Sequence, residues 1–473
     1  MSRRSHKGFG YYMRQIFICA LLIVCALYIG AHIYIQKQIV PVSNILENSV
    51  LKDRKFDAKV KEIHANDMSA YFLEEHSNPI ISVRFLFQNA GFAYEPEDKQ
   101  GVSTLLAEVL LAGGGEYDAE QFKDICAEYG IKLEFSSDTD NFSGVLQFPS
   151  EYKEIAVKIF QSAFYRPNYE ENYFNLAKSQ QLTVLRMQQE NPDKILNEEF
   201  KQFIFAGHPY ERNALGQIEI VENLTIEDVE SYRQTKFAQN NLLIGLAGDL
   251  TLDEASELLN EIFSSLPEKS DGEKFVPLSL ETSGAEKSVE RNSAQAVVKF
   301  AVQGTFRDSV DFYPLYMANS VFGASGLTSR LNKVIREEKG LTYGIYTYMT
   351  ISDAAALIEG SFSATPENFD TAKQLLLEEW QKLGENGVSE EELEQAKKSL
   401  ISAYNLRFAE IDSIASMLLA MQKYNLGIDF LDKRNDYISE VSLQEVNAAA
   451  KKYFKTMPDM VYIGTLPKIK EKE

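Results

Sequence analysis

The chain has 473 residues, of which 45% are hydrophobic and 25% are charged, a composition typical of a folded protein with more than one core. Its 69 acidic and 48 basic residues give a formal charge of −21, which disfavours binding to nucleic acid. The three cysteines, Cys19, Cys25 and Cys126, are too few and too scattered for a disulfide framework or a cysteine-based zinc cluster.

An apolar segment near the N-terminus predicts one membrane span. Residues 16–35 contain no Asp, Glu, Lys or Arg over a length that suits a helix crossing the hydrocarbon core. Four basic residues precede the segment and only Lys37 follows it closely, which favours a cytoplasmic N-terminus at 1–15. We therefore expect a single-pass anchor in the inner (cytoplasmic) membrane and a linker at 36–55, with the bulk of the chain facing the periplasm or another extracytoplasmic space. A cleaved signal peptide is the alternative.

Two features recur along the remaining chain at nearly constant separation. The strand-like run at 81–85 is echoed at 296–300, 215 residues later. Helices with capping boxes begin in LTIEDVESYRQTKF at Leu224 and in VSLQEVNAAAKKYF at Val441, 217 residues apart, and each leads to a short apolar strand. Because the two separations agree, we predict an internal duplication.

The duplication predicts an α+β fold of two homologous sheet-plus-helix domains, preceded by the transmembrane helix. Strand-like runs such as GVLQF at 144–148 alternate with amphipathic helices such as FDTAKQLLLEEWQKLG at 369–384. We place the N-terminal domain at 56–266 and the C-terminal domain at 291–473. The segment between them, 267–290, is rich in Pro, Gly, Ser and charge and is predicted to be the interdomain linker.

Three motifs, in the expected order, resemble the pitrilysin/insulinase family of zinc metallopeptidases, whose relatives include mitochondrial processing peptidase. They are GFAYEPEDKQGVSTLLAEVLLAGGG at 91–115, FKQFIFAGHPYERNALGQ at 200–217 and GASGLTSRLNKVIREEKGLTYGIYTY at 323–348. The resemblance covers nearly all of the chain after the apolar segment. It implies peptide hydrolysis at a zinc ion held by HxxEH on the helix after the first glycine, with a third ligand, a Glu, on a later helix.

The zinc motif that the resemblance implies is degenerate in this chain. The two His positions hold Thr104 and Glu108, and the position of the general base holds Ala107. The candidate positions for the third ligand hold the apolar Val184 and Leu185. Glu108 is either a lone carboxylate ligand or an ordinary helix residue. We therefore expect this chain to bind no metal.

The histidines offer no replacement site. No two of the five stand three or four residues apart, so no helical His pair can hold zinc. His76 and His208 are nearest in sequence to the degenerate motif but belong to separate predicted elements. We expect His208, in the segment GHPY, to make a local loop contact.

The C-terminal half matches the family in a different respect. The resemblance implies that an Arg and a Tyr seven residues later hold the substrate and stabilise the developing oxyanion, and Arg336 and Tyr343 occupy these positions. A guanidinium can donate to a peptide carbonyl and a phenol to a tetrahedral oxygen. The alternative is that Arg336 is a solvated residue in the last helical turn before Gly340, and that Tyr343 is an ordinary strand aromatic.

These features together imply a division of roles between two chains. We expect a non-catalytic or half-site subunit of a heterodimeric zinc metallopeptidase, which supplies Arg336 and Tyr343 to a partner's site. The partner would be a family subunit that holds the zinc. A homodimer of this chain is the other expected arrangement. The substrate would be an extended peptide bound by strand addition. A catalytically silent peptide-binding or assembly protein is the main alternative. An autonomous zinc peptidase with unusual ligands is the third.

Overall fold

A computed structural model describes residues 58–65 and 68–465. The predicted membrane span at 16–35 and the segments on either side of it, 1–15 and 36–55, lie outside these residues. Within the described ranges, no helix is long and apolar enough to cross a bilayer.

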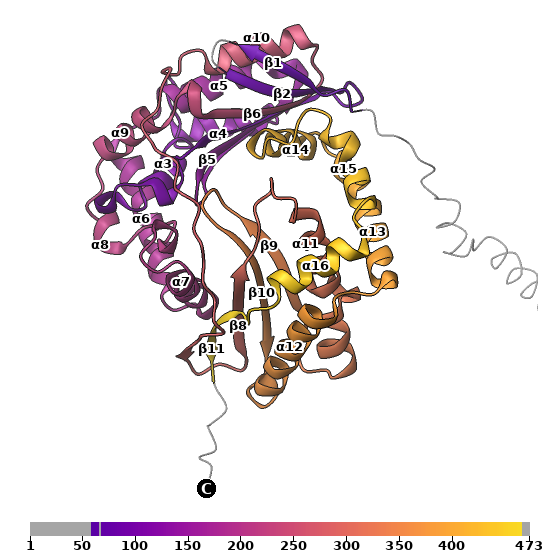
Figure 1. Ribbon diagram of the computed structural model, residues 1–473. Coiled ribbons are helices and arrows are strands. Elements are labelled where there is room, and N and C mark those ends of the chain that lie inside the picture. The colour runs from indigo at the N-terminus through magenta and orange to yellow at the C-terminus, as the bar shows by residue number, and fades with distance from the viewer. Residues whose placement is uncertain (1–57, 66–67, 466–473) are drawn as a thin grey trace, which may run out of the picture. The chain divides into compact units, whose positions relative to one another are not determined.

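The N-terminal half forms one sheet with helices packed against it (Figure 1). Its strands are β1 (Lys61–Ala65), β2 (Met68–Glu74), β3 (Ile80–Gln88), β4 (Lys132–Ser137), β5 (Asn141–Pro149) and β6 (Leu242–Gly248). Its helices are α3 (Val102–Val109), α4 (Ala119–Glu128), α5 (Lys153–Tyr165), α6 (Glu171–Gln188), α7 (Pro192–Ile204), α8 (Ile218–Val221), α9 (Ile226–Lys236) and α10 (Leu252–Phe263). Across the described residues the strand order is β1-β2-β6-β3-β5-β4, and only the β2–β6 pair is parallel.

The C-terminal half forms a second sheet. Its strands are β7 (Glu286–Glu290), β8 (Ala296–Gln303), β9 (Ile345–Ile351), β10 (Ala356–Ala364) and β11 (Asp459–Gly464). Its helices are α11 (Phe312–Asn319), α12 (Pro366–Asn386), α13 (Glu390–Tyr404), α14 (Ile411–Lys423), α15 (Phe430–Ser439) and α16 (Leu443–Tyr453). The strand order is β7-β11-β8-β10-β9, with β7 and β11 as the parallel pair.

The two sheets confirm the predicted duplication. The order β2-β6-β3-β5-β4 in the first sheet corresponds, strand for strand, to β7-β11-β8-β10-β9 in the second. The expected strand runs at 81–85 and 296–300 lie in the equivalent strands β3 and β8. Thr225 and Ser442 form the expected capping boxes at the start of α9 and α16. An α+β fold with two sheet-plus-helix domains is therefore present.

A detail of core packing is also duplicated. In the first sheet Phe85 lies opposite Gly144, and in the second Phe300 lies opposite Gly360. A Cβ atom on Gly144 would lie 2.2 Å from the Phe85 ring, and one on Gly360 would lie 2.1 Å from the Phe300 ring. Each phenylalanine thus covers a glycine across the strands, and both aromatic rings are fully buried.

The halves exchange a helix, which the sequence pattern did not indicate. Helix α7, from the N-terminal half, packs on β11 and β8 of the second sheet, and α14, from the C-terminal half, packs on β6, β3 and β2 of the first. Gly245 in β6 allows the close approach of α14, because a Cβ atom there would lie 2.1 Å from the carbonyl oxygen of Ala415. The two domains are therefore interlocked.

Helix α14 is also anchored to the first sheet by charge. Arg84 donates to Asp412 through Nε to Oδ1 and through Nη2 to Oδ2, both at 2.6 Å, and the Ser82 hydroxyl adds a bond to Oδ1 at 3.0 Å. The guanidinium holds the pKa of Asp412 below its ordinary value. A bidentate pair of this kind fixes orientation as well as contributing energy.

A buried junction links the halves near the β9–β10 turn. Asp140 is 2% exposed and accepts from the Tyr210 hydroxyl at 2.5 Å and from the backbone N–H of Asp353 at 2.9 Å. The Tyr210 oxygen in turn accepts from the backbone N–H of Ala354 at 2.9 Å. Burial raises the pKa of Asp140 to about 6. The junction holds the turn of the second sheet against the first domain.

The segment expected to be a linker differs from expectation at its end. Residues 267–285 run without a regular helix or strand, but the last five residues of the range 267–290 form β7, which pairs with β11. The segment is also held in place, because Phe275 stacks on Tyr94 with ring centroids 4.2 Å apart.

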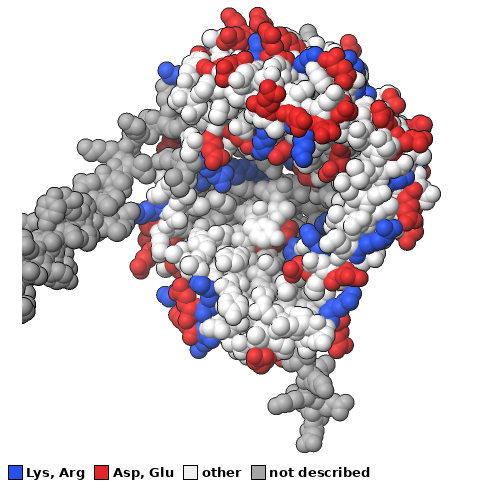
Figure 2. Space-filling model, turned by 180° about the vertical axis from the view of Figure 1, so that it is seen from behind, with Lys and Arg blue, Asp and Glu red and all other residues white. Residues whose placement is uncertain are grey.

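Figure 2 shows the acidic excess spread over the visible face, with Lys and Arg between, and a hollow in its middle.

Candidate functional site

Helix α3 carries the degenerate zinc-motif positions, and none of their side chains is arranged as a ligand. The Thr104 hydroxyl donates to the carbonyl oxygen of Ala214 at 2.6 Å, so it fastens a neighbouring loop. Ala107 is buried in the core behind the helix, and Glu108 is exposed at its surface. On α3, Thr104 therefore attaches a loop, Ala107 packs in the core and Glu108 faces solvent.

The third-ligand segment lies in α6, as expected, and it too lacks a carboxylate. Leu185 is buried in the first core, whereas Val184 is 44% exposed and points away from it. One turn earlier, the buried Gln181 donates through Nε2 to the carbonyl oxygens of Gly101, at 3.0 Å, and Leu215, at 2.8 Å. A neutral amide therefore joins α6 to the start of α3. Sequence reasoning missed Gln181, although its spacing of four from Leu185 places it on the same helix face.

Glu95 holds the N-terminus of α3 and was also missed. It is 4% exposed. Its carboxylate accepts from the backbone N–H of Gly101 at 2.7 Å, and from the N–H and hydroxyl of Ser103 at 2.8 and 2.6 Å. Burial raises the pKa of Glu95 to about 7, while these hydrogen bonds and Arg212 act in the opposite direction. An acceptor at this end of a helix satisfies free N–H groups and suits the helix dipole.

The described residues contain no group of three or more His, Cys, Asp or Glu side chains that could hold a metal ion. His208 makes the local loop contact that the sequence led us to expect, because its Nδ1 accepts from the backbone N–H of Tyr210 at 3.2 Å. Its ring also packs edge-on against Tyr210 and Phe275.

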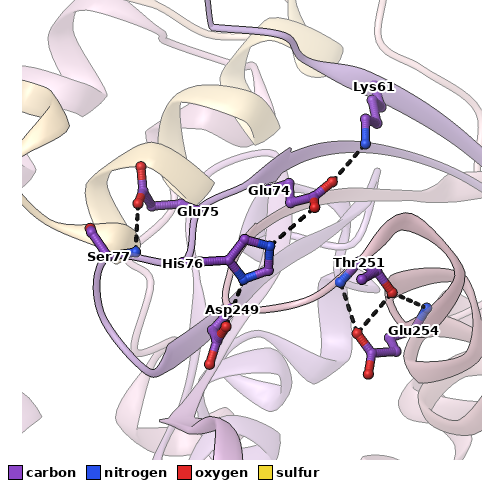
Figure 3. A network of polar contacts seen from close by, with 8 residues as sticks. All are labelled: Lys61, Glu74, Glu75, His76, Ser77, Asp249, Thr251 and Glu254. Carbon is purple, nitrogen blue, oxygen red and sulfur yellow. Dashed lines mark hydrogen bonds and ion pairs between the residues drawn. The ribbon is translucent and has the colours of Figure 1, made fainter.

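His76 lies between two carboxylates where strands β2 and β6 of the first sheet end (Figure 3). Its Nδ1 is 2.7 Å from Asp249 Oδ1, and its Nε2 is 3.1 Å from Glu74 Oε1. The Ser150 hydroxyl donates to the other oxygen of Asp249 and not to the imidazole, so the arrangement lacks the Ser–His contact of a nucleophilic site. The hydrogen bonds to Asp249 and Glu74 raise the pKa of His76, which makes the network a surface ion cluster.

The His76 network predicts a pH-dependent contribution to stability. Because the folded-state pKa lies above the unfolded one, protonated His76 stabilises the fold fully below about pH 6.5, and this contribution is lost as the pH rises through the folded-state pKa. His76→Gln should therefore lower the free energy of unfolding at pH 5.5 more than at pH 9, as measured by urea denaturation. His64, whose side chain is 70% exposed, provides the control variant His64→Gln. An equal cost of His76→Gln at both pH values would contradict the assignment.

Arg336 and Tyr343 lie at the two ends of a tight connection into the edge strand β9. Arg336 is half-buried in the last turn of a π-helical segment, η8 (Asn332–Glu338), and its carbonyl oxygen accepts from the N–H of Gly340 at 3.0 Å. Tyr343 is 83% exposed. Neither side chain makes a hydrogen bond or ion pair with another described residue. The position of Arg336 before Gly340, whose φ is +65°, agrees with the helix-end geometry expected from the sequence.

The connection itself is held firmly. The Asn332 side chain donates to the carbonyl oxygen of Ile345 at 2.6 Å, and the Thr342 hydroxyl donates to that of Ser363 at 2.7 Å. These bonds fix the backbone on both sides of Tyr343 while its phenol stays exposed. No hydrogen bond or ion pair joins Arg336 or Tyr343 to the α3 positions in the described part of the chain. The two predicted sets of site residues are therefore separate within one chain.

Fold and site together define the class: a duplicated α+β chain built like a zinc metallopeptidase, with Thr104, Ala107 and Glu108 at the positions of the zinc motif. The model of the insulinase family, peptidase family M16, matches residues 71–217, and that of the peptidase M16 inactive domain matches 223–400. The chain belongs to the M16 family, as its motifs indicated.

Among curated relatives, the non-peptidase homolog YmxG of Helicobacter pylori is 26% identical over 390 residues, covering 82% of this chain and 89% of the relative. An uncharacterized zinc protease, YmxG of Bacillus subtilis, is 20% identical over 370 residues, covering 77% of this chain and 88% of the relative.

Two solved structures share the fold. The peptidase M16 inactive domain of Pseudomonas fluorescens has a TM-score of 0.81 and 23% identity, covering 88% of this chain and 100% of that one. The periplasmic protease PqqL of Escherichia coli has a TM-score of 0.71 and 17% identity, and covers 87% of this chain but only 47% of PqqL.

Proposed function

We propose that this chain is a catalytically silent M16 subunit that supplies Arg336 and Tyr343 to the active site of a zinc-bearing family member. One observation carries the proposal. The ligand and base positions on α3 hold other residue types, whereas Arg336 and the exposed Tyr343 match the family's residue types and make no hydrogen bond or ion pair with another side chain among residues 58–65 and 68–465. A chain that served only as a scaffold would have no need for a guanidinium and a phenol on one fixed connection.

The chemistry of the two side chains suits peptide hydrolysis at a partner's site. The guanidinium can donate to a carbonyl oxygen of the bound peptide before reaction, since its donors form a rigid fork. The phenol can donate to the oxygen that becomes negative as the tetrahedral intermediate forms. Because the backbone at Thr342 and Asn332 is fixed by hydrogen bonds, the Tyr343 side chain starts from a defined anchor point.

The edge strand β4 supports binding of an extended peptide by strand addition. Among the described strands β4 pairs only with β5, so its other edge is open to another strand. A cavity of about 330 Å³ beside it is lined by Glu134, Phe135 and Leu419, the last contributed by α14. A peptide paired with β4 could place one side chain in this cavity.

Pairing with a second family chain is the finer part of the proposal. The match to PqqL covers 47% of that protein, which leaves room there for a second unit of similar length. A heterodimer of this chain with a zinc-bearing subunit would supply from two chains the two units that PqqL has room for in one. The homodimer is the other arrangement we propose, although it would contain no chain with intact ligand positions.

A catalytically silent peptide-binding or assembly protein is the second candidate. It is favoured by the name of the Helicobacter pylori relative, a non-peptidase homolog, and by the loss of every expected ligand. The two candidate functions differ in one expected outcome. If the chain is a silent peptide-binding or assembly protein, removing the Tyr343 hydroxyl has no effect on a partner's catalysis.

We propose that an anchor at 16–35 places the bulk of the chain outside the cytoplasm, because the basic residues near the apolar segment lie mainly before it. A phosphatase that works only outside the cytoplasm, fused to the C-terminus, should be active. A full-length but inactive fusion contradicts this orientation.

We expect the purified full-length chain to hold no stoichiometric zinc after dialysis, as measured by elemental analysis. The combined change Thr104→His, Ala107→Glu and Glu108→His should not restore tight binding, because Val184 and Leu185 leave the third ligand absent. About one tightly held zinc per wild-type chain would contradict the proposal and favour an autonomous peptidase with unusual ligands.

A further inference from the structure

A cavity in the C-terminal half has a composition that the proposed function does not use. It has a volume of about 420 Å³ and lies among α11, α14, α15 and β9, which are neighbours in Figure 1. We call it the arginine–tyrosine cavity, because Arg307, Arg407 and Arg434 line it together with Tyr313, Tyr316, Tyr348, Tyr404 and Tyr424. A volume of this size suits a small organic ligand or one residue of a peptide.

The charge of the cavity opposes that of the chain. Three arginines line it and no Asp or Glu does, although the chain as a whole carries 69 acidic and 48 basic residues. The nearest carboxylate bonded to the wall is that of Glu359, which accepts from the Tyr348 hydroxyl at 3.1 Å and does not itself line the cavity. A lining that is positively charged attracts anions, and low-dielectric walls strengthen that attraction.

Arg307 is the residue that most requires a partner. Its guanidinium makes no hydrogen bond or ion pair with a described residue, and lies 4.0 Å from the ring centroid of Phe312 and 5.5 Å from those of Tyr313 and Phe430. Burial lowers the pKa of Arg307. A guanidinium stays charged in proteins, and because that of Arg307 is only partly buried and has no acceptor among the described residues, its donors are open to a ligand in the cavity.

Arg434 is already positioned. Its Nη1 donates to the carbonyl oxygen of Leu400 and to Asn435 Oδ1, both at 3.0 Å, and its guanidinium lies 4.5 Å from the ring centroid of Tyr404. These contacts hold one side of the guanidinium in place. The remaining donors are available to an anion in the cavity.

An unsatisfied amide in the cavity wall gives an independent indication of a ligand. Asn319, on α11, is 1% exposed, and its Oδ1 has no hydrogen-bond partner. Buried polar atoms are almost always hydrogen-bonded, so a missing partner at a cavity wall points to an unfilled position. The hydroxyls of Tyr313 and Tyr316, on the same helix, likewise have no acceptor among the described residues.

The rest of the wall is apolar and adaptable. Met349, Met417, Met421 and Phe430 contribute to it. Methionine side chains adjust to irregular shapes, and aromatic rings offer flat contact surfaces. A small inorganic anion would leave this part of the cavity without a contact.

We infer that the arginine–tyrosine cavity binds a carboxylate attached to an aromatic or other bulky apolar group, with Arg307 and Arg434 on the carboxylate and the methionine wall on the apolar body. Two sources share this chemistry: the C-terminal residue of a peptide and a free aromatic acid. The site is separate from Arg336 and Tyr343, neither of which lines the cavity.

Isothermal titration of the full-length chain with N-acetyl-L-phenylalanine and with its neutral amide tests the inference. The two probes differ only in the terminal group, a carboxylate in one and a neutral amide in the other. The difference between their affinities therefore reports the role of the carboxylate. We expect the acid to bind at least tenfold more tightly than the amide. The peptide Ala-Ala-Ala-Phe with a free C-terminus distinguishes the sources: binding equal to that of the acid indicates a peptide end, and binding of the acid alone indicates a free acid.

Variants locate the site. Arg307→Gln should weaken binding of the acid at least tenfold, and Arg307→Lys should retain part of the affinity because the charge remains but the fork is lost. Arg291→Gln, at an exposed arginine that does not line this cavity, is the control and should bind as the wild type does. Should Arg307→Gln not fold, Tyr316→Phe removes one donor from the same wall.

The inference is wrong if acid and amide bind equally, if neither binds at millimolar concentration, or if Arg307→Gln and Tyr316→Phe both fold and bind the acid with full affinity. Inorganic phosphate that binds while the acid does not would also overturn it, because the apolar wall would then have no role. All of these readouts are independent of peptidase activity, so they stand apart from the test of the proposed function.

Discussion

Tyr343→Phe is expected to lower the turnover number of the complex between this chain and its zinc-bearing partner by about a hundredfold or more, with little change in KM. The substitution removes one hydroxyl donor and keeps the ring. Because the side chain is 83% exposed and makes no hydrogen bond with the residues that the structure describes, folding and association should survive. Steady-state cleavage of an extended peptide by the mixed complex measures the effect.

Arg336→Ala should act on the same reaction but differently, since the guanidinium would contact the peptide before reaction. We expect KM to rise as well as turnover to fall. Tyr346→Phe, at an exposed tyrosine of the edge strand β9 that follows Tyr343, and Lys333→Ala, at an exposed cation of the same helical segment as Arg336, are the matched controls. Full activity of both Tyr343→Phe and Arg336→Ala would favour the silent assembly protein instead.

Glu95→Ala is expected to cost roughly 3 kcal/mol of stability, because it leaves the buried N–H groups of Gly101 and Ser103 at the start of α3 without an acceptor. Glu95→Gln should cost less, roughly 2 kcal/mol, since one acceptor oxygen is kept while an amide N–H₂ faces another donor. Urea denaturation of the full-length chain at pH 8, above the Glu95 pKa of about 7, measures both changes.

Glu97 supplies the control for Glu95. It lies two residues later and is exposed, so Glu97→Gln should change the stability by no more than about 0.5 kcal/mol. A cost of Glu95→Ala as small as that of the control would mean that α3 does not depend on the carboxylate. The expected result would show instead that the Glu95 carboxylate stabilises the start of α3.

Much of the fold could be predicted because the signals are local or repeated. Capping boxes at Thr225 and Ser442 depend on residues three apart, and the duplication repeats the same alternation of strands and helices. The exchange of α7 and α14 could not be predicted, since each helix has an apolar face that suits either sheet. The space at Gly245 and contacts between residues far apart in the sequence, such as the Arg84–Asp412 pair at a separation of 328 residues, favour the observed partner for α14.

The candidate site, like the fold, could be predicted from the sequence only in part. Thr104, Ala107 and Glu108 could be recognised as degenerate from their positions in a motif, and their places on α3 explain what they do instead. Glu95 and Gln181 could not be recognised, because their partners are backbone groups that become neighbours only on folding. The unpaired state of Arg307 likewise depends on which carboxylates do not approach it, and a sequence does not reveal that.

Steady-state cleavage of one extended peptide by three samples, this chain alone, a zinc-bearing M16 partner alone and their mixture, tests the central claim most directly. The account predicts that the mixture cleaves, that this chain alone does not, and that the activity of the mixture falls about a hundredfold with Tyr343→Phe. A partner that is fully active by itself and unchanged by addition of this chain would contradict it.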